Sequence, residues 1–150
     1  MTLGLSEKQI AAIDAVLDIA LNAGTSTVHS GDITARRGIP RRYLEPILQQ
    51  LSRSGVLIGT RGPQGGYRLA RERRRITLGD LVRAMGARET SAVVPIAGKT
   101  VGRRIVEGVL GDIEAMVMQR LDAVTVEELC WRARAEGGVR PAVAEVDFAI

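Results

Sequence analysis

Arginine is the residue type in this 150-residue chain that is best suited to bind another molecule, and most of the arginines lie in one segment. Residues 36–75 hold eleven arginines against Glu45 and Glu72, a net charge of +9, whereas residues 1–35 carry −3 and residues 76–150 carry −2. Guanidinium groups bind phosphates and base edges through a fixed fork of N–H donors. So concentrated a charge predicts a polyanionic partner, because solvated surface charge is ordinarily scattered.

The segment "RGPQGGYRLA", residues 61–70, joins two of these arginines to three glycines and a proline. Short apolar runs at 56–60 and 66–70 flank its turn-forming residues, which predicts a β-hairpin. Glycine lets the tip turn sharply and approach another molecule closely. We expect Arg61 to reach a narrow minor groove of DNA, whose negative potential favours guanidinium, while Gln64 either stiffens the tip or adds a donor.

Two short helices joined by a turn precede the hairpin, which is typical of a helix-turn-helix. Ser30 is expected to cap the first helix, which runs through Arg37, and Gly38 supplies the turn. The second helix lies within residues 39–54, and its expected inward positions have helical spacing: Leu44, Ile47, Leu48 and Leu51. A helix-turn-helix followed directly by a hairpin is the order of a winged helix.

The second helix of such a pair enters the major groove with its N-terminal residues toward the bases. That places four side chains there: Arg41, Arg42, Tyr43 and Glu45. Arginine can clamp guanine O6 and N7, and Glu45 can accept from cytosine N4. Alternatively, Glu45 only forms an ion pair that orients Arg41 or Arg42. The Tyr43 ring is expected to pack into the core, with its hydroxyl alone reaching a phosphate.

Further basic residues are candidate phosphate contacts, which position a protein on DNA without reading its sequence. These are Lys8, Arg36, Arg37, Arg53 and Arg68. The run "ARERRR", residues 70–75, either lies along the DNA backbone or is simply solvated. His29, the single histidine, is expected at the surface or beside a phosphate rather than as a metal ligand.

The periodicity of the chain indicates a DNA-binding domain over residues 1–85 and a loop over 86–99. Residues 100–138 predict a long helix and a following short helix, and residues 139–150 a loose tail. Good N-capping residues mark four expected helix starts: Ser6, Ser30, Thr77 and Thr125.

The long helix, expected over residues 100–123, carries an apolar stripe whose spacing mixes three and four residues. So long a helix beside a small domain needs a surface on which to bury that stripe, and the same helix of a second copy provides one. The expected dimer interface comprises Ile105, Val109, Ile113, Met116, Val117 and Leu121.

Composition favours the same architecture. Apolar residues make up 45% of the chain and aromatic residues only 3%, so the core is aliphatic, which favours helices. The expected fold class is mainly α with a small β wing, a winged helix-turn-helix domain plus a long C-terminal dimerisation helix. A cytoplasmic location is expected, because the sequence contains no membrane span or signal peptide and one cysteine, Cys130, cannot form an internal disulfide.

Three motifs in this order carry a resemblance: "GIPRRYLEPILQQL", "RGPQGGYRLA" and "ITLGDLVRAM". From about Leu3 to Leu129 the chain resembles the Rrf2 family of bacterial winged-helix transcription regulators. The resemblance implies a homodimer on a partly palindromic double-stranded DNA site. It also implies that the position of Glu45 reads bases, that Arg42 lies on the same surface, and that Arg61 enters the minor groove.

One departure from the family concerns metal. The family's cluster-binding members carry three cysteines between the short helix after the wing and the start of the long helix. Residues 86–104 hold no cysteine, and Cys130 lies beyond the long helix, where one thiolate cannot hold a cluster. We expect no iron–sulfur cluster with the family's ligands, and no other cofactor or metal.

No combination of residues supports catalysis, since the chain has no nucleophile–histidine–carboxylate set and no phosphate-binding glycine loop. The leading hypothesis is a sequence-specific regulator, most simply a repressor. The alternatives are a winged-helix module that binds protein, or a nonspecific architectural DNA-binding protein. Its signal could be a regulatory protein that binds the dimer, a small-molecule effector held between the helix after the wing and the dimer helix, or oxidation of Cys130.

Overall fold

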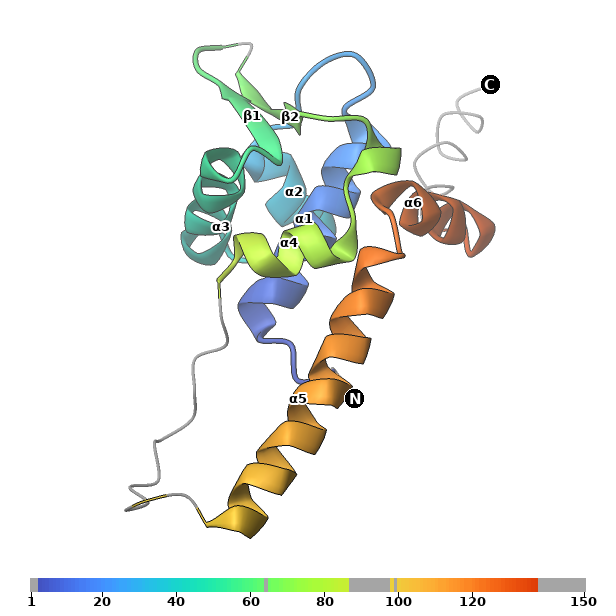
Figure 1. Cartoon of the computed structure of the whole chain (residues 1–150). Coiled ribbons are helices and arrows are strands. Elements are labelled where there is room, and N and C mark those ends of the chain that lie inside the picture. Colours follow the sequence, from blue (N-terminus) through green and yellow to red (C-terminus); the bar gives the residue numbers. More distant parts are fainter. Residues whose placement is uncertain (1–2, 64, 87–97, 99, 138–150) are drawn as a thin grey trace.

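The protein is mainly α-helical with one small β-hairpin, as the sequence predicts (Figure 1). A computed structural model describes residues 3–63, 65–86, 98 and 100–137. Within them the elements follow the order α1 (Glu7–Asn22), α2 (Ser30–Arg37), α3 (Arg41–Arg53), β1 (Leu57–Thr60), β2 (Gly66–Leu69), the 3-10 turn η1 (Arg73–Arg75), α4 (Leu78–Ala84), α5 (Val101–Asp122) and α6 (Val126–Ala135).

Most helix starts are set by local capping. Ser6 forms a capping box with Gln9 at α1, and Thr77 forms one with Asp80 at α4. The Thr125 side chain accepts from the Glu128 N–H at the start of α6, as predicted. The expectation for α2 was wrong, because His29 is its N-cap residue and contributes no side-chain bond.

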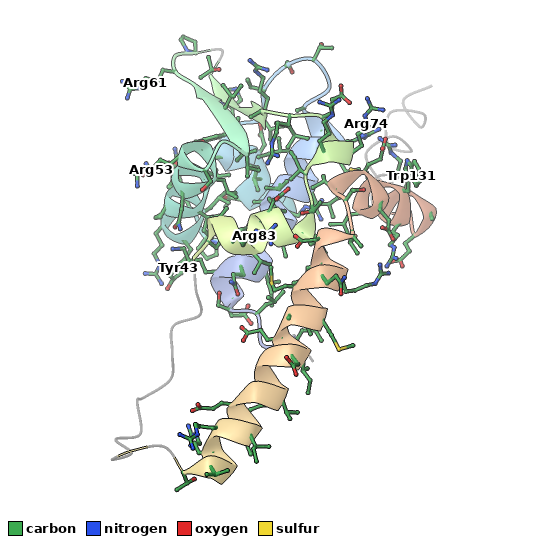
Figure 2. The ribbon with its side chains drawn as sticks, viewed as in Figure 1. Tyr43, Arg53, Arg61, Arg74, Arg83 and Trp131 are labelled. Carbon is green, nitrogen blue, oxygen red and sulfur yellow. The ribbon has the colours of Figure 1, made fainter. Side chains whose placement is uncertain are left out.

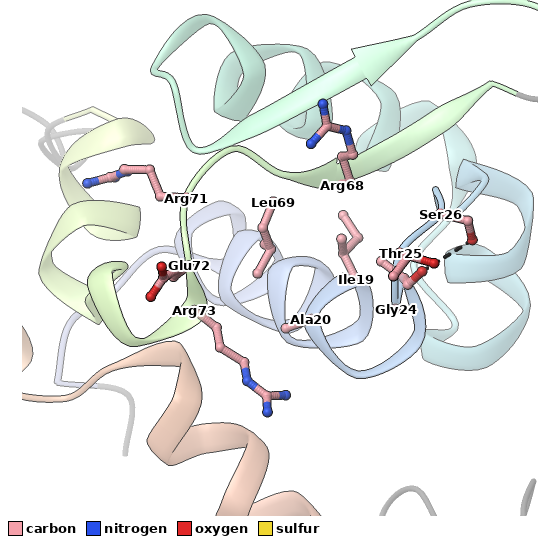
Figure 3. Close-up of a pocket in the computed structure, with 11 residues that line it drawn as sticks. Ile19, Ala20, Gly24, Thr25, Ser26, Arg68, Leu69, Arg71, Glu72 and Arg73 are labelled. Carbon is pink, nitrogen blue, oxygen red and sulfur yellow. Dashed lines mark hydrogen bonds between the residues drawn. The ribbon is translucent and has the colours of Figure 1, made fainter.

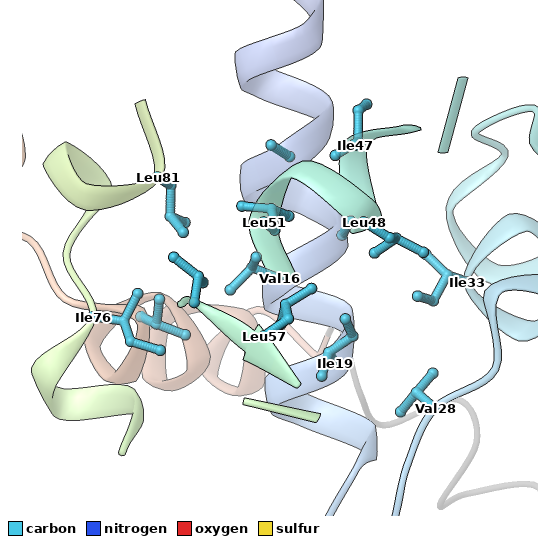
Figure 4. Packing of buried hydrophobic residues seen from close by; sticks show 14 of the residues in the cluster. Val16, Ile19, Val28, Ile33, Ile47, Leu48, Leu51, Leu57, Ile76 and Leu81 are labelled. Carbon is cyan, nitrogen blue, oxygen red and sulfur yellow. The ribbon is translucent and has the colours of Figure 1, made fainter. Parts of the chain in front are cut away.

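The core is aliphatic and surrounds α1, which passes through the centre of the winged domain (Figure 4). The predicted inward positions of α3 are all buried, and they pack with residues of α1, α2, β1 and α4. α6 also packs against α1, since Val126 and Cys130 belong to the same core cluster. The most deeply buried side chains include Val16, Ile19, Ile33, Leu44, Leu48, Leu51, Leu57, Ile76 and Leu81.

The hairpin is held to the helices by its return strand. β1 and β2 pair antiparallel, with Leu57 opposite Leu69 and Thr60 opposite Gly66. Val28, from the segment between α1 and α2, exchanges two backbone hydrogen bonds of 2.8 Å with Tyr67. Gly66 has φ +132°, and a Cβ there would lie 2.7 Å from the Val28 carbonyl oxygen, so only glycine permits this approach.

α5 extends away from the winged domain (Figure 1), and within the described residues its buried Leu121 lies at the end that packs against α4. No helix among the described residues is long and apolar enough to cross a membrane. The predicted loop over 86–99 lies, apart from residues 86 and 98, outside the described residues, as does the predicted tail over 139–150.

Candidate nucleic-acid interface

The first turn of α3 presents its polar side chains to solvent. Gly38 ends α2 in the left-handed conformation, with φ +69°, and α3 begins three residues later at Arg41. Leu44 anchors this turn in the core, which leaves Arg41 and Arg42 exposed on the outer side of the helix. The structure therefore places the two predicted base-reading arginines on an accessible helix end.

The expectation of a buried Tyr43 ring was wrong. The residue is 55% exposed, because it lies on the flank of α3, beside the buried stripe that begins at Leu44. The Arg42 guanidinium lies 4.8 Å from the centre of the Tyr43 ring, and its Nη2 donates to the Tyr43 hydroxyl at 3.1 Å. The pair places a positive charge over an aromatic ring at the start of α3.

Glu45 is fixed by two donors. One of its carboxylate oxygens, Oε1, accepts from Arg41 Nε at 3.1 Å and from Ser30 Oγ at 3.0 Å. Ser30 is thus a residue whose role the sequence analysis missed, since it holds Glu45 instead of capping α2. Among the described residues no hydrogen bond reaches Oε2 of Glu45. The carboxylate therefore orients Arg41 and still has an oxygen that can accept from another molecule.

Arg61 follows β1 at the tip of the hairpin and is exposed (Figure 2). Gly65 lets the tip close, since a Cβ there would lie 2.5 Å from the Thr60 carbonyl oxygen. Thr27 Oγ1 donates to the Gly65 carbonyl at 2.9 Å, which ties the tip to the segment before α2. Gln64 lies outside the described residues. Together, Arg41, Arg42, Tyr43, Glu45 and Arg61 are termed the recognition surface below.

Arg36 and Arg37 form ion pairs with carboxylates of the same chain. Both donate to Asp18, a fully buried carboxylate of α1, with Arg36 Nη2 at 2.8 Å and Arg37 Nε at 3.0 Å. The hydrogen bond with Asp18 raises the pKa of Arg36. Arg37 also lies 3.2 Å from Asp14. These contacts clamp α2 onto α1, a structural role that the sequence analysis did not anticipate.

The other predicted phosphate contacts differ in their surroundings. Lys8, Arg53 and Arg68 are exposed and form no ion pair among the described residues. In the run over 70–75, by contrast, Arg74 pairs with Glu72. Figure 2 shows Arg53, Arg61 and Tyr43 on one side of the molecule and Arg74 on the other side. The run is therefore separated from the recognition surface.

A pocket of about 450 Å³ lies between the end of α1 and the strand β2 (Figure 3). Ile19, Ala20 and Leu69 form its apolar floor, and the Ser26 hydroxyl beside it donates to the Ala23 carbonyl at 3.2 Å. Arginines line its edge, but Figure 3 shows the guanidinium groups of Arg71 and Arg73 directed away from that floor. These two arginines therefore do not converge on the apolar floor.

The residues present do not fit an iron–sulfur cluster. Cys130 is the single cysteine, it is fully buried, and burial raises the pKa of its thiol, which opposes thiolate ligation. Within the described ranges no group of three or more histidine, cysteine, aspartate or glutamate side chains could hold a metal ion. His29 is exposed at the start of α2.

A second candidate surface runs along α5. Most of its large apolar side chains are between 51% and 68% exposed: Val101, Ile105, Val106, Val109, Leu110, Ile113 and Met116. Val117 is half-buried. Leu121, expected in this stripe, is only 7% exposed because the C-terminal end of α5 packs against α4, so it belongs to the interior of the chain.

Comparisons with known proteins agree with this arrangement. The family model described as "Rrf2: Iron-dependent Transcriptional regulator" matches residues 5–132. The HTH-type transcriptional regulator IscR of Klebsiella pneumoniae (strain 342) is 38% identical over 81 residues, which cover 54% of this chain and 50% of that protein. The regulator of the same name from Vibrio vulnificus (strain YJ016) is 31% identical over 127 residues, which cover 83% of this chain and 76% of that protein. The chain thus spans about half the length of the curated relatives first matched.

Solved structures show the same fold. T. potens IscR superposes with a TM-score of 0.70 at 29% identity, covering 89% of this chain and 91% of that one. CymR, the global cysteine regulator of B. subtilis, has a TM-score of 0.67 at 24% identity, and the match covers 85% of this chain and 95% of that one. The similarity to CymR shows the fold alone. These relatives are transcriptional regulators, so the expectation that the chain is not an enzyme is confirmed.

Proposed function

The chain belongs to the Rrf2 family of transcriptional regulators, and from this premise we propose that it acts as a homodimeric, sequence-specific repressor without a family-type iron–sulfur cluster. The observation that carries the proposal is the recognition surface, where exposed arginines of α3 and of the hairpin tip lie on one side of the winged domain. Such an arrangement suits a duplex, because a helix end can enter the major groove while the tip reaches the minor groove.

The roles within the recognition surface follow from its contacts. Glu45 holds Arg41 through Nε, and within the described part of the chain the terminal nitrogens of that guanidinium make no hydrogen bond and can donate to guanine. Arg42 and Tyr43 offer a charged face to a phosphate or a base edge. Arg53, Arg68 and Lys8 remain candidate phosphate contacts, whereas we assign Arg36 and Arg37 to the internal clamp on Asp18.

A second copy of the chain is the proposed occupant of the exposed face of α5. The helix has 22 residues, about 33 Å of length, and its apolar side chains cover roughly half of its circumference. A helix so apolar on one broad face is stable in water only when that face is covered. A C2 dimer buries the face on both copies at once and sets the two recognition surfaces on one duplex.

The signal is proposed to act without a cluster, since one buried cysteine cannot supply the thiolate ligands. Burial of Cys130 also argues against oxidation of this residue as the signal. A regulatory protein or a small-molecule effector that binds the dimer is the remaining route. An absorbance spectrum of protein purified without oxygen tests this point, and a broad visible band that accompanies iron would contradict it.

The function itself is tested by recovering bound fragments from a random pool of DNA. We expect a preferred, partly palindromic sequence, and affinity that falls steeply with salt. Steep salt dependence without a preferred sequence would instead indicate an architectural protein. No affinity for DNA would indicate a protein-binding module.

Single arginine variants test whether the recognition surface contacts DNA. Arg42→Ala and Arg61→Ala are each expected to weaken binding to the recovered site by about 10- to 100-fold. Arg74→Ala is the matched control, because this exposed arginine lies on the other side of the domain and pairs with Glu72. If Arg42→Ala and Arg61→Ala bind as the wild type does, the recognition surface is wrongly assigned.

A further inference from the structure

The contact between α4 and α5 is built as a rigid joint, defined here as residues 76–83 and 121–126. The Leu78 N–H donates to the Val124 carbonyl at 2.9 Å, and the Val126 N–H donates to the Ile76 carbonyl at 2.8 Å. These bonds form an antiparallel bridge between Thr77 and Thr125. Backbone pairing of this kind fixes the end of α5 against the start of α4.

A bidentate ion pair spans the joint beside this bridge. Arg83 Nη2 donates to Asp122 Oδ1 at 2.6 Å, and Arg83 Nη1 donates to Asp122 Oδ2 at 3.2 Å. Asp122 is the last residue of α5, where the helix dipole disfavours a carboxylate, so the charge of Arg83 offsets that cost. The hydrogen bond with Asp122 raises the pKa of Arg83. We name this pair the clasp.

Gly79 makes room for the clasp. A Cβ on this residue would lie 1.8 Å from Asp122 Oδ1, far inside van der Waals contact. The residue lies within α4, where glycine is otherwise unfavourable to the helix. The close approach of Asp122 therefore gives a physical reason for a glycine at this position.

The other end of α4 is attached to the recognition helix and to α1. Gln50 of α3 donates through Nε2 to the Ala84 carbonyl at 2.9 Å. Gln9 of α1 is buried and donates through Nε2 to the Gly86 carbonyl at 3.2 Å. α4 is thus bonded at its C-terminal end to the helix that presents Arg41 and Arg42, and at Arg83 to the end of α5.

We propose that the clasp and Gly79 fix the angle between α3 and α5, and so determine the half-site spacing that the dimer accepts on DNA. The inference rests on the proposed function, since it requires a dimer formed through α5 and a recognition surface on α3. In a C2 dimer built on α5, each winged domain is attached at the end of a long helix. A small rotation at that end therefore changes the distance between the two α3 helices by a large amount. DNA presents its half-sites at fixed intervals along the helical turn, so a rigid joint selects one spacing and a loose joint accepts several.

The test is a series of duplexes that carry the wild-type site with its central spacer lengthened or shortened by one or two base pairs. The wild type is expected to lose about tenfold or more in affinity for each altered spacer. Asp122→Asn removes the ion pair, and Gly79→Ala displaces the Asp122 carboxylate while it retains every charge. Because the backbone bridge and the buried Leu121 remain, both variants are expected to reduce the wild-type penalty for an altered spacer by about threefold, with unchanged affinity for a single half-site.

Two controls separate the clasp from general effects. Arg132→Ala breaks an exposed pair of the same length, 2.6 Å to Glu128, inside α6, and is expected to keep the wild-type spacing preference. Asp122→Glu retains a carboxylate for Arg83 and is expected to keep that preference. Gly79→Ala replaces glycine by the best helix former and so is expected to stay folded, which circular dichroism checks.

The outcomes distinguish failure of this inference from failure of the proposed function on which it rests. If the wild type shows no preferred paired site, the proposed function fails before the clasp is tested. If the wild type prefers one spacing and both Asp122→Asn and Gly79→Ala retain the same preference, the clasp does not set the spacing.

Discussion

Apolar side chains of the same types are buried in the winged domain and exposed on α5. Val16, Ile19 and Ile33 are fully buried around α1, whereas Val101 and Ile105 on α5 are more than 60% exposed. The helical period is present in both regions, so local sequence does not explain the difference. What differs is that α1 packs against α2, α3, α4, β2 and α6, whereas within the described residues the large apolar side chains of α5 before residue 117 are exposed.

This difference supports the proposed dimer, because the winged domain buries its apolar side chains within one chain and α5 leaves most of its own exposed. Burial of apolar area is the main favourable contribution to folding, and α5 gains little of it from its own chain. Substitutions in the two regions should therefore have different consequences, one for the folding of each chain and one for the association of two chains.

The largest expected effect is that of Leu48→Ala, which removes a fully buried side chain of α3. The free energy of unfolding should fall by about 2–5 kcal/mol, because a cavity adds to the loss of apolar burial. Urea denaturation measures it. Leu110→Ala makes the same change on α5, and its effect should vanish on dilution if it acts through the proposed dimer. Equal losses for both at all concentrations would contradict the comparison.

The next effect is that of Ile113→Glu, which places a charge in the middle of the exposed face of α5. The dissociation constant of the dimer should rise by about 100-fold, because two carboxylates are buried in one symmetric interface. Sedimentation equilibrium measures this constant. Glu114→Gln, an exposed neighbour beyond the edge of the apolar face, serves as the control and should leave the constant unchanged.

A smaller effect is expected at the joint from Asp80→Asn. Burial raises the pKa of Asp80, but hydrogen bonds from the Thr77 N–H and hydroxyl and from Arg83 outweigh it, so the pKa lies below its ordinary value. A lowered folded-state pKa stabilises the fold at neutral pH, and that contribution is lost as pH falls through the folded-state pKa. The variant should lose about 1 kcal/mol or less at pH 7, and the difference from the wild type should shrink below about pH 4. Thermal melts between pH 7 and pH 3 provide the measurement.

The smallest effect concerns Cys130, whose thiol lies in the core between α6 and α1. Burial raises the pKa of this thiol, so little thiolate is present at neutral pH. A thiol reagent should label the native protein only after denaturant is added, and oxidant at low concentration should leave DNA binding unchanged. Rapid labelling of the native protein would contradict the burial.

Local pattern predicted the fold well where the cause lies within a few residues. The capping boxes at Ser6 and Thr77 act over three residues, and the inward face of α3 follows from helical period alone. The hairpin could be predicted because glycine and proline between two apolar runs have few other conformations. The same reasoning failed for Ser30, a good capping residue that hydrogen-bonds Glu45, fifteen positions away, instead.

Contacts between distant residues were beyond such reasoning. Asp18 reads as one more polar residue of α1, and only the packing of α2 against α1 brings Arg36 and Arg37 to its carboxylate. Tyr43 was misplaced because an aromatic residue next to Leu44 could face either way until the edge of the core was known.

The sequence by itself determined the order of the elements, the concentration of charge in residues 36–75 and the presence of a single cysteine. These follow from residue type and short spacing. Tertiary structure decided which arginines are engaged internally, that Leu121 lies inside the chain, and that Gly79 makes room for the Asp122 carboxylate. The physical reason is that such contacts depend on how whole helices pack, and packing is set by all the buried side chains together rather than by any one stretch of sequence.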